Sequence, residues 1–239
     1  MCMRRFSKAI IIMIALLTAF RGIAQTPGSG YWNFFNAKAD INKNFNFFVE
    51  GQARSQKFFY DYFYNEIKGG LGYTPTPGTN LLLGLGKYTT YQLYGNFKSP
   101  VQSNEFRLWE QLTFNNEAGP IKFEHRYRVE QRFYKGGYYR NRFRYRLSAT
   151  LPIKHSKFYL NSFEEVFLTN RNPYFERNRL FGGVGYKFTD VFTFQIGYVS
   201  QYDFNRNINP YTKNFLQTSF LFDLNKHQKQ EAKLPTIDE

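Results

Sequence analysis

Charged side chains recur at every second position through two neighbouring segments of this chain, 120–134 and 138–152. A period of two places these side chains on one face of a β-sheet. That face carries eight basic and two acidic residues, which we call the charged ladder: Lys122, Glu124, Arg126, Arg128, Glu130, Arg132, Arg140, Arg142, Arg144 and Arg146. Such a face predicts either an interior held by salt bridges and ordered water or a basic constriction that binds or passes anions.

The partners of the ladder follow from the hairpin that joins the two segments at Gly136 and Gly137. Pairing through this hairpin should place Glu130 opposite Arg142 or Arg144. Basic residues that face one another repel, so further carboxylates must come from other strands. The candidates are Glu105, either Glu164 or Glu165, and either Glu50 or Glu66.

The three histidines do not predict a catalytic or metal site. His155 falls in a turn and His227 in the C-terminal tail, whereas His125 lies on the outward face of a strand. A barrel lipase needs a serine within reach on the same wall, but Ser148 has the opposite parity and Ser162 is two strands away. No histidine has a second metal ligand at useful spacing. We therefore expect no catalytic residue, no metal and no cofactor.

The segments that carry these residues have strand character, and none of the chain shows a convincing helical period. The candidate strands are 31–41, 45–56, 61–74, 80–92, 103–115, 120–134, 138–152, 157–168, 175–188, 191–204 and 213–224. Prolines fall in turns or at strand ends, as a sheet requires. Glycine-rich runs such as 182–185 lie inside strands, where they suit bending and close packing.

The apolar faces of these strands decide the fold class. In one of them Phe192, Phe194 and Ile196 alternate with Thr193 and Gln195. A soluble sandwich turns its apolar face inward, whereas each segment here is long enough for a tilted strand to cross a bilayer. The sequence predicts an all-β fold, a transmembrane antiparallel β-barrel of about 10–12 strands with lipid outside and charge in the lumen.

The connections predict an orientation but leave the number of strands open. Short connections at 42–44, 75–79, 116–119, 153–156 and 189–190 alternate with longer ones at 57–60, 93–102, 135–137, 169–174 and 205–212. Short periplasmic turns and longer outer loops are usual in barrels, and this assignment ends 213–224 in the periplasm. The segment 31–41 then runs the wrong way, and eleven segments conflict with an even number of strands. Either a strand is missed, or 31–41 is a lumenal or partial arm.

The ends of the chain lie outside the predicted barrel. Basic residues precede a short apolar run, 9–20, and Ala24 completes a small-residue cleavage site, which predicts export and removal of a signal peptide after Ala24. The only cysteine, Cys2, lies in that leader, so the mature chain has no thiol. The predicted organisation is a signal peptide at 1–24, a barrel at 25–224 and a polar tail at 225–239.

The excess of basic residues limits the possible partners. Removal of Arg4, Arg5, Lys8 and Arg21 with the leader leaves 28 basic and 18 acidic residues, a net charge of +10. Export makes nucleic acid an unsuitable partner for this basic, aromatic-rich chain. We expect contacts with outer-membrane lipids and lipopolysaccharide, and anionic solutes are candidate ligands.

Short motifs along the mature chain resemble those of one family. They are Trp32, Glu50–Arg54 (EGQAR), Glu105–Gln111 (EFRLWEQ), His125–Arg132 (HRYRVEQR), Arg140–Arg144 (RNRFR), Asn161–Glu164 (NSFE), Arg177–Arg179 (RNR) and Gly197–Tyr198. By their order and spacing the chain resembles the domain of unknown function 2490 family of predicted bacterial outer-membrane β-barrel proteins. The resemblance implies a location and an architecture, but no activity and no functional residue.

These observations predict a porin-like barrel in the outer membrane of a Gram-negative bacterium. Its role would be structural, or a narrow anion-preferring transport or binding role. Two alternatives stay open: an outer-membrane lipid-modifying enzyme of the phospholipase or deacylase type, and a soluble periplasmic β-protein. We do not expect an enzyme, because His125 lacks a serine partner on its own wall.

Overall fold

Every predicted segment forms a strand in the computed structural model of the protein, which describes residues 30–98, 100–205 and 208–225. The strands are β1 (Gly30–Asp40), β2 (Phe45–Lys57), β3 (Tyr60–Thr76), β4 (Thr79–Tyr91), β5 (Val101–Ala118), β6 (Ile121–Tyr134), β7 (Tyr139–Pro152), β8 (Phe158–Thr169), β9 (Phe175–Lys187), β10 (Phe192–Asn205) and β11 (Ile208–Asp223). The predicted signal peptide, 1–24, and the tail from 226 onwards lie outside the described residues.

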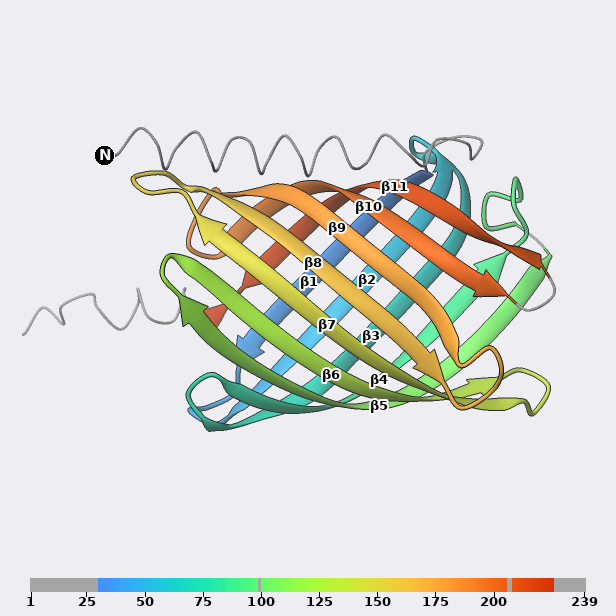
Figure 1. Ribbon diagram of the computed structural model, residues 1–239, viewed down its shortest axis with the longest axis horizontal. Helices are drawn as coiled ribbons and strands as arrows, with labels where there is room; N and C mark the ends of the chain where they lie inside the picture. Colours follow the sequence, from blue (N-terminus) through green and yellow to red (C-terminus); the bar gives the residue numbers. More distant parts are fainter. Residues whose placement is uncertain (1–29, 99, 206–207, 226–239) are drawn as a thin grey trace, which may run out of the picture.

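Consecutive strands pair antiparallel, and β1 closes the barrel by pairing with β11 (Figure 1). The all-β barrel predicted from the sequence is therefore confirmed. The closing pair is parallel, with Gly30 opposite Phe215 and Lys38 opposite Asp223. Eleven strands joined by hairpins make this unavoidable, because the first and last of an odd number of alternating strands point the same way. In the part of the chain that the structure describes, no helix is long and apolar enough to cross a membrane.

β1 corrects the expectation of an even number of strands. The sequence suggested that 31–41 is a lumenal arm or that a strand is missed, but β1 is a full member of the wall between β2 and β11. The physical reason is that closure depends on pairing between the two ends of the chain, which no local pattern encodes. An odd number of strands is known in a mitochondrial barrel, so closure of a barrel does not require an even number.

The connections define two rims. At the turn rim lie 41–44, 77–78, 119–120, 153–157 and 188–191, and at the loop rim lie 58–59, 92–98, 135–138 and 170–174. The predicted alternation in length is wrong except between β4 and β5, because several strands extend further than expected. Phe59 and Asp61 both have positive φ and let the β2–β3 turn close tightly. β1 begins at the loop rim and β11 ends at the turn rim, at opposite ends of the barrel (Figure 1).

The outer face of the wall is apolar and the inner face is polar. Ile67, Leu71 and Leu83 are 63%, 61% and 66% exposed on the outside, whereas Glu130 and Glu165 are 0% and 1% exposed on the inside. The strand period of two sorts the side chains in this way, since neighbours in sequence point to opposite faces. The arrangement is the reverse of a soluble sandwich, in which the apolar face is covered by a second sheet.

Aromatic side chains fill part of the interior. One cluster contains Trp32, Phe63, Phe181, Val199 and Phe215, and a second contains Leu82, Tyr88 and Trp109. Glycines on neighbouring strands make room for the rings. A Cβ added to Gly84 would lie 2.3 Å from the Trp109 indole. The glycine-rich runs therefore allow close packing inside strands.

Replacing Gly84 with valine should lower the free energy of unfolding by about 1–3 kcal/mol, because the new side chain must displace Trp109 from a packed interior. The measurement is urea unfolding of the purified protein in detergent micelles, followed by tryptophan emission. Gly182→Val is the matched control, since nothing lies within 4 Å of a Cβ at that outward position. Equal stability of the two variants would contradict this packing.

Candidate functional site

The hairpin register brings the charged ladder together on the inner face of β6 and β7. Glu130 lies opposite Arg142, which is one of the two pairings that the sequence allowed. Lys122, at the turn-rim end of the ladder, is exposed and pairs with Glu117 at 3.3 Å. The other members share the parity of Glu130 and point to the inside of the wall.

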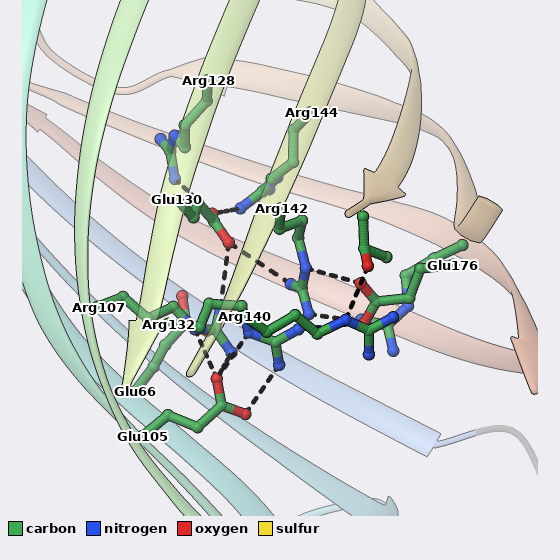
Figure 2. Close-up of polar contacts among 12 residues, drawn as sticks. Glu66, Glu105, Arg107, Arg128, Glu130, Arg132, Arg140, Arg142, Arg144 and Glu176 are labelled. Atoms are coloured by element: carbon green, nitrogen blue, oxygen red, sulfur yellow. Dashed lines mark hydrogen bonds and ion pairs between the residues drawn. The ribbon is translucent and has the colours of Figure 1, made fainter. Parts of the chain in front are cut away.

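Glu130 is a fully buried carboxylate among four arginines (Figure 2). Nη1 of Arg144 donates a hydrogen bond to Oε1 of Glu130 at 2.5 Å. Guanidinium nitrogens of Arg107 and Arg142 each lie 3.6 Å from Oε2, and one of Arg128 lies 3.7 Å from Oε1. Arg107, Arg142 and Arg144 each pair with a second carboxylate as well, whereas Glu130 is the only carboxylate within 4 Å of Arg128 among the described residues. An unpaired ion in such an interior is costly.

Glu165, on β8, binds a second group of arginines, which come from β6, β7 and β9. Guanidinium nitrogens of Arg126, Arg144 and Arg179 lie 2.5, 2.7 and 3.2 Å from its oxygens. Its sequence neighbour Glu164 faces outward and is exposed. The strand register therefore resolves the choice between Glu164 and Glu165 that the sequence left open, and Arg144 bridges the two carboxylate centres.

Two further carboxylates bind arginines through two hydrogen bonds each, nearer the loop rim (Figure 2). Nε and Nη2 of Arg132 donate to Glu105, both at 2.9 Å. Nε and Nη2 of Arg142 donate to Glu176 at 2.9 and 2.8 Å. Paired donors of this kind fix the planes of both groups and form strong, directional ion pairs.

Glu50 and Glu66 do not serve the ladder, which corrects one expectation from the sequence. Both form ion pairs with Lys68, whose Nζ lies 2.6 Å from Glu66 and also contacts Glu50. The reason is local, because Lys68 faces Glu50 across the β2–β3 pair and shares the inward parity of Glu66.

Several charged residues of the interior were not predicted from the sequence. Arg107 on β5, Arg177 and Arg179 on β9, and Asp203 on β10 all join the ion-pair network. Arg107 and Arg179 share the inward parity of Glu105 and Glu165, so a period-two reading of these strands could have identified them.

These charged groups surround a cavity of about 210 Å³ in the half of the interior nearer the loop rim. Its wall has nine basic and three acidic side chains. The basic ones are Arg54, Lys68, Arg107, Arg132, Arg142, Arg144, Arg177, Arg179 and Lys213, and the acidic ones are Glu66, Glu105 and Glu176. Glu130, Glu165 and Asp203, which do not line the cavity, offset part of this positive charge through their ion pairs. The remaining excess attracts anions and raises their local concentration.

His125 lies on the outer face, away from the cavity. Its ring nitrogens lie 3.0 Å from the Tyr145 hydroxyl and 3.1 Å from the side-chain oxygen of Asn116, and the ring stacks on Phe114. Ser148 is buried and has the opposite parity. His125 is therefore part of a small polar and aromatic cluster near the turn rim. No group of three potential metal ligands occurs among the described residues.

Comparison with known proteins gives one match. The model of the family described as a protein of unknown function, DUF2490, matches residues 29–212. The matched region covers most of the chain and includes the charged ladder and the carboxylates that bind it. No curated protein and no solved structure matches the chain.

Proposed function

This chain belongs to the DUF2490 family, and we propose that it is an integral outer-membrane β-barrel that binds small anions in an Arg-rich interior. The observation that carries the proposal is the sorting of side chains across a closed wall, apolar outside and charged inside. Lipids and lipopolysaccharide would cover the outside. Small anions would enter from the loop rim, where the cavity lies.

The apolar outer wall supports a membrane location. Among the described residues, 41 large hydrophobic side chains are exposed; 31 of them lie on strands, with at least one on each of the eleven. Soluble monomers rarely expose apolar patches of more than a few hundred Å². Burying a leucine or phenylalanine side chain stabilises a structure by about 1.5–3 kcal/mol, and in this barrel only lipid can supply that burial.

The filled interior supports binding in preference to free conduction. The aromatic clusters of Trp32 and Trp109 occupy part of the lumen, and some ion pairs join strands that are not neighbours, such as Arg132 on β6 with Glu176 on β9. Side chains just fill a barrel of about eight strands, and in this barrel of eleven strands they leave the cavity of about 210 Å³. We therefore propose a cavity that holds anions, with at most a narrow path past them.

Fractionation and electrophoresis test the location. The full chain, expressed with its leader in a Gram-negative host, should stay in the outer-membrane fraction after a carbonate wash. Unheated samples should migrate faster than boiled ones, because a folded barrel is compact in detergent. A protein that is released by carbonate and shows no heat-dependent shift would support the soluble alternative. In planar bilayers we expect no large channel currents; stable porin-sized conductance would contradict the filled interior.

A further inference from the structure

We propose that Arg54 binds the charged group of a small oxyanion, a phosphate, sulfate or carboxylate, in the cavity near the loop rim. This inference rests on the anion-binding interior proposed above and assigns its ligand class and its principal residue. Arg54 belongs to β2, which lies across the barrel from the β6–β7 hairpin that carries the charged ladder. Its side chain lines the cavity.

The guanidinium of Arg54 is held between two aromatic rings. Its central carbon lies 3.6 Å from the ring centroid of Trp32 and 4.3 Å from that of Tyr64. The side chain as a whole is only 8% exposed. Stacking stabilises the cation through both of its faces. It leaves the N–H groups, which lie in the plane of the guanidinium, to find partners elsewhere.

Those N–H groups are poorly satisfied. Nη2 of Arg54 donates a long hydrogen bond of 3.4 Å to Gln52, and Nε has no partner. Among the described residues, no carboxylate oxygen lies within 4 Å of this guanidinium. A buried charge without a counter-charge is strongly unfavourable. The Arg54 guanidinium therefore needs a hydrogen-bond acceptor, and an acceptor with a negative charge stabilises it most.

The carboxylates nearest to this part of the cavity already have partners. Glu66 pairs with Lys68 at 2.6 Å, and Asp203 pairs with Arg177. Drawing Asp203 to Arg54 would leave Arg177 unpaired, and Glu66 would have to give up its hydrogen bonds from Lys68 and the Tyr64 hydroxyl. Neither carboxylate reaches Arg54 in this arrangement, and a ligand can supply the acceptor that Arg54 lacks.

Other side chains that can bind the same ligand converge on the cavity. Arg179 approaches Trp32 as well, with its central carbon 4.9 Å from the ring centroid. The hydroxyl of Tyr88 is buried in the cavity wall and has no hydrogen-bond partner. An unpaired guanidinium N–H and an unpaired phenol can both donate to an oxygen ligand.

The size of the cavity limits the ligand. Its volume of about 210 Å³ exceeds the roughly 150 Å³ of an apolar cavity that holds benzene. Since benzene has six non-hydrogen atoms, a ligand of up to about eight non-hydrogen atoms fits by the same scale. An oxyanion has two oxygens for the paired donors of a guanidinium, whereas chloride offers a single acceptor. We expect preference for phosphate, sulfate or carboxylate over chloride.

Equilibrium dialysis of the purified mature protein in a non-ionic detergent tests the site with radiolabelled inorganic phosphate as the probe. Binding should be saturable, and sulfate or acetate should compete more effectively than chloride at the same ionic strength. Arg54→Gln should weaken phosphate binding by about tenfold or more, because a hydrogen-bonded charge is lost. Arg54→Lys keeps the positive charge and is the control for a loss of binding through misfolding. This variant should still bind phosphate but should no longer discriminate against chloride.

Arg171→Gln is the matched control. Arg171 also stacks on an aromatic ring, at 4.8 Å from the Tyr138 centroid, but it is exposed and does not line the cavity. Its replacement should leave phosphate binding unchanged. Unchanged binding in Arg54→Gln, equal competition by chloride, or no saturable binding would each overturn the assignment.

The outcomes separate this inference from the proposed location. Arg54-dependent binding by a protein that carbonate releases from the membrane would keep the anion site and reject the outer-membrane barrel. A heat-modifiable outer-membrane protein whose Arg54→Gln variant binds phosphate normally would keep the barrel and reject the site. If lipopolysaccharide phosphate is the natural ligand, purified lipopolysaccharide should displace labelled phosphate at far lower phosphate concentration than unlabelled phosphate does, and that result would also overturn a cavity site for small solutes.

Discussion

Replacing Glu130 with glutamine should lower the free energy of unfolding by about 3–5 kcal/mol, the largest effect that we expect from a single interior substitution. Glu130 is 0% exposed, and its carboxylate is the shared counter-charge of Arg107, Arg128, Arg142 and Arg144. Glutamine keeps the shape but removes the negative charge, and its amide group adds donors that face guanidinium donors. Urea unfolding in detergent micelles is the measurement.

Glu117→Gln is the control for this substitution. Glu117 also pairs with a basic side chain, Lys122, but the two side chains are 63% and 62% exposed. Exposed pairs contribute little, so the control should change stability by less than about 1 kcal/mol. If Glu130→Gln were as mild as Glu117→Gln, the interior would be well hydrated, and the ion-pair network would not stabilise the barrel.

Replacing Leu85 with arginine on the outer face should destabilise the membrane-inserted barrel by about 2–4 kcal/mol. Leu85 lies midway along β4 and is 54% exposed. In lipid, this position places the new charge near the middle of the bilayer. In water, the same change on an exposed site should alter stability by less than about 0.5 kcal/mol. The yield of heat-modifiable protein in the outer membrane and urea unfolding in vesicles measure the effect.

Ile41→Arg is the matched control for the outer-face substitution. Ile41 is 59% exposed and lies in the β1–β2 connection at the turn rim. A charge at the membrane interface costs about 0–1 kcal/mol, so this variant should insert nearly as well as the wild type. Similar tolerance of both substitutions would contradict a bilayer around the middle of β4.

The strands were predictable from the sequence because the period of two is a local property. Each strand has one face for the interior and one for the outside, and the pattern persists through most segments. The strand number was not predictable, because β1 pairs with β11 across the whole length of the chain. The lengths of connections also depended on turn geometry, as at Phe59 and Asp61, which a count of residues does not reveal.

The charged ladder could be predicted because a single short hairpin joins its two strands. Its partners on β9 were harder to find, because the register shifts beside Phe167 and Leu168. Arg177 pairs with Phe167 and Phe175 with Leu168, which leaves Glu176 as an extra residue. Glu176 and Arg177 both line the cavity although they are adjacent in sequence. Simple alternation cannot place both on the same face.

Arg54 shows a different limit of the sequence. It alternates correctly within β2, but its isolation from carboxylates depends on which acids pair with Lys68 and Arg177. Those choices are made between strands that are far apart in the chain. The sequence therefore indicates a basic interior, whereas the particular cation without a partner is a property of the folded barrel.

The most direct test of the membrane barrel is depth-dependent quenching of a fluorophore on the outer wall. The predicted mature chain has no cysteine, so Leu85→Cys gives a single labelling site. In vesicles, lipids brominated near the middle of their acyl chains should quench a fluorophore at this position, and aqueous iodide should not. Strong quenching by iodide with no effect of the brominated lipids would contradict the account, since it would place the apolar face of the wall in water.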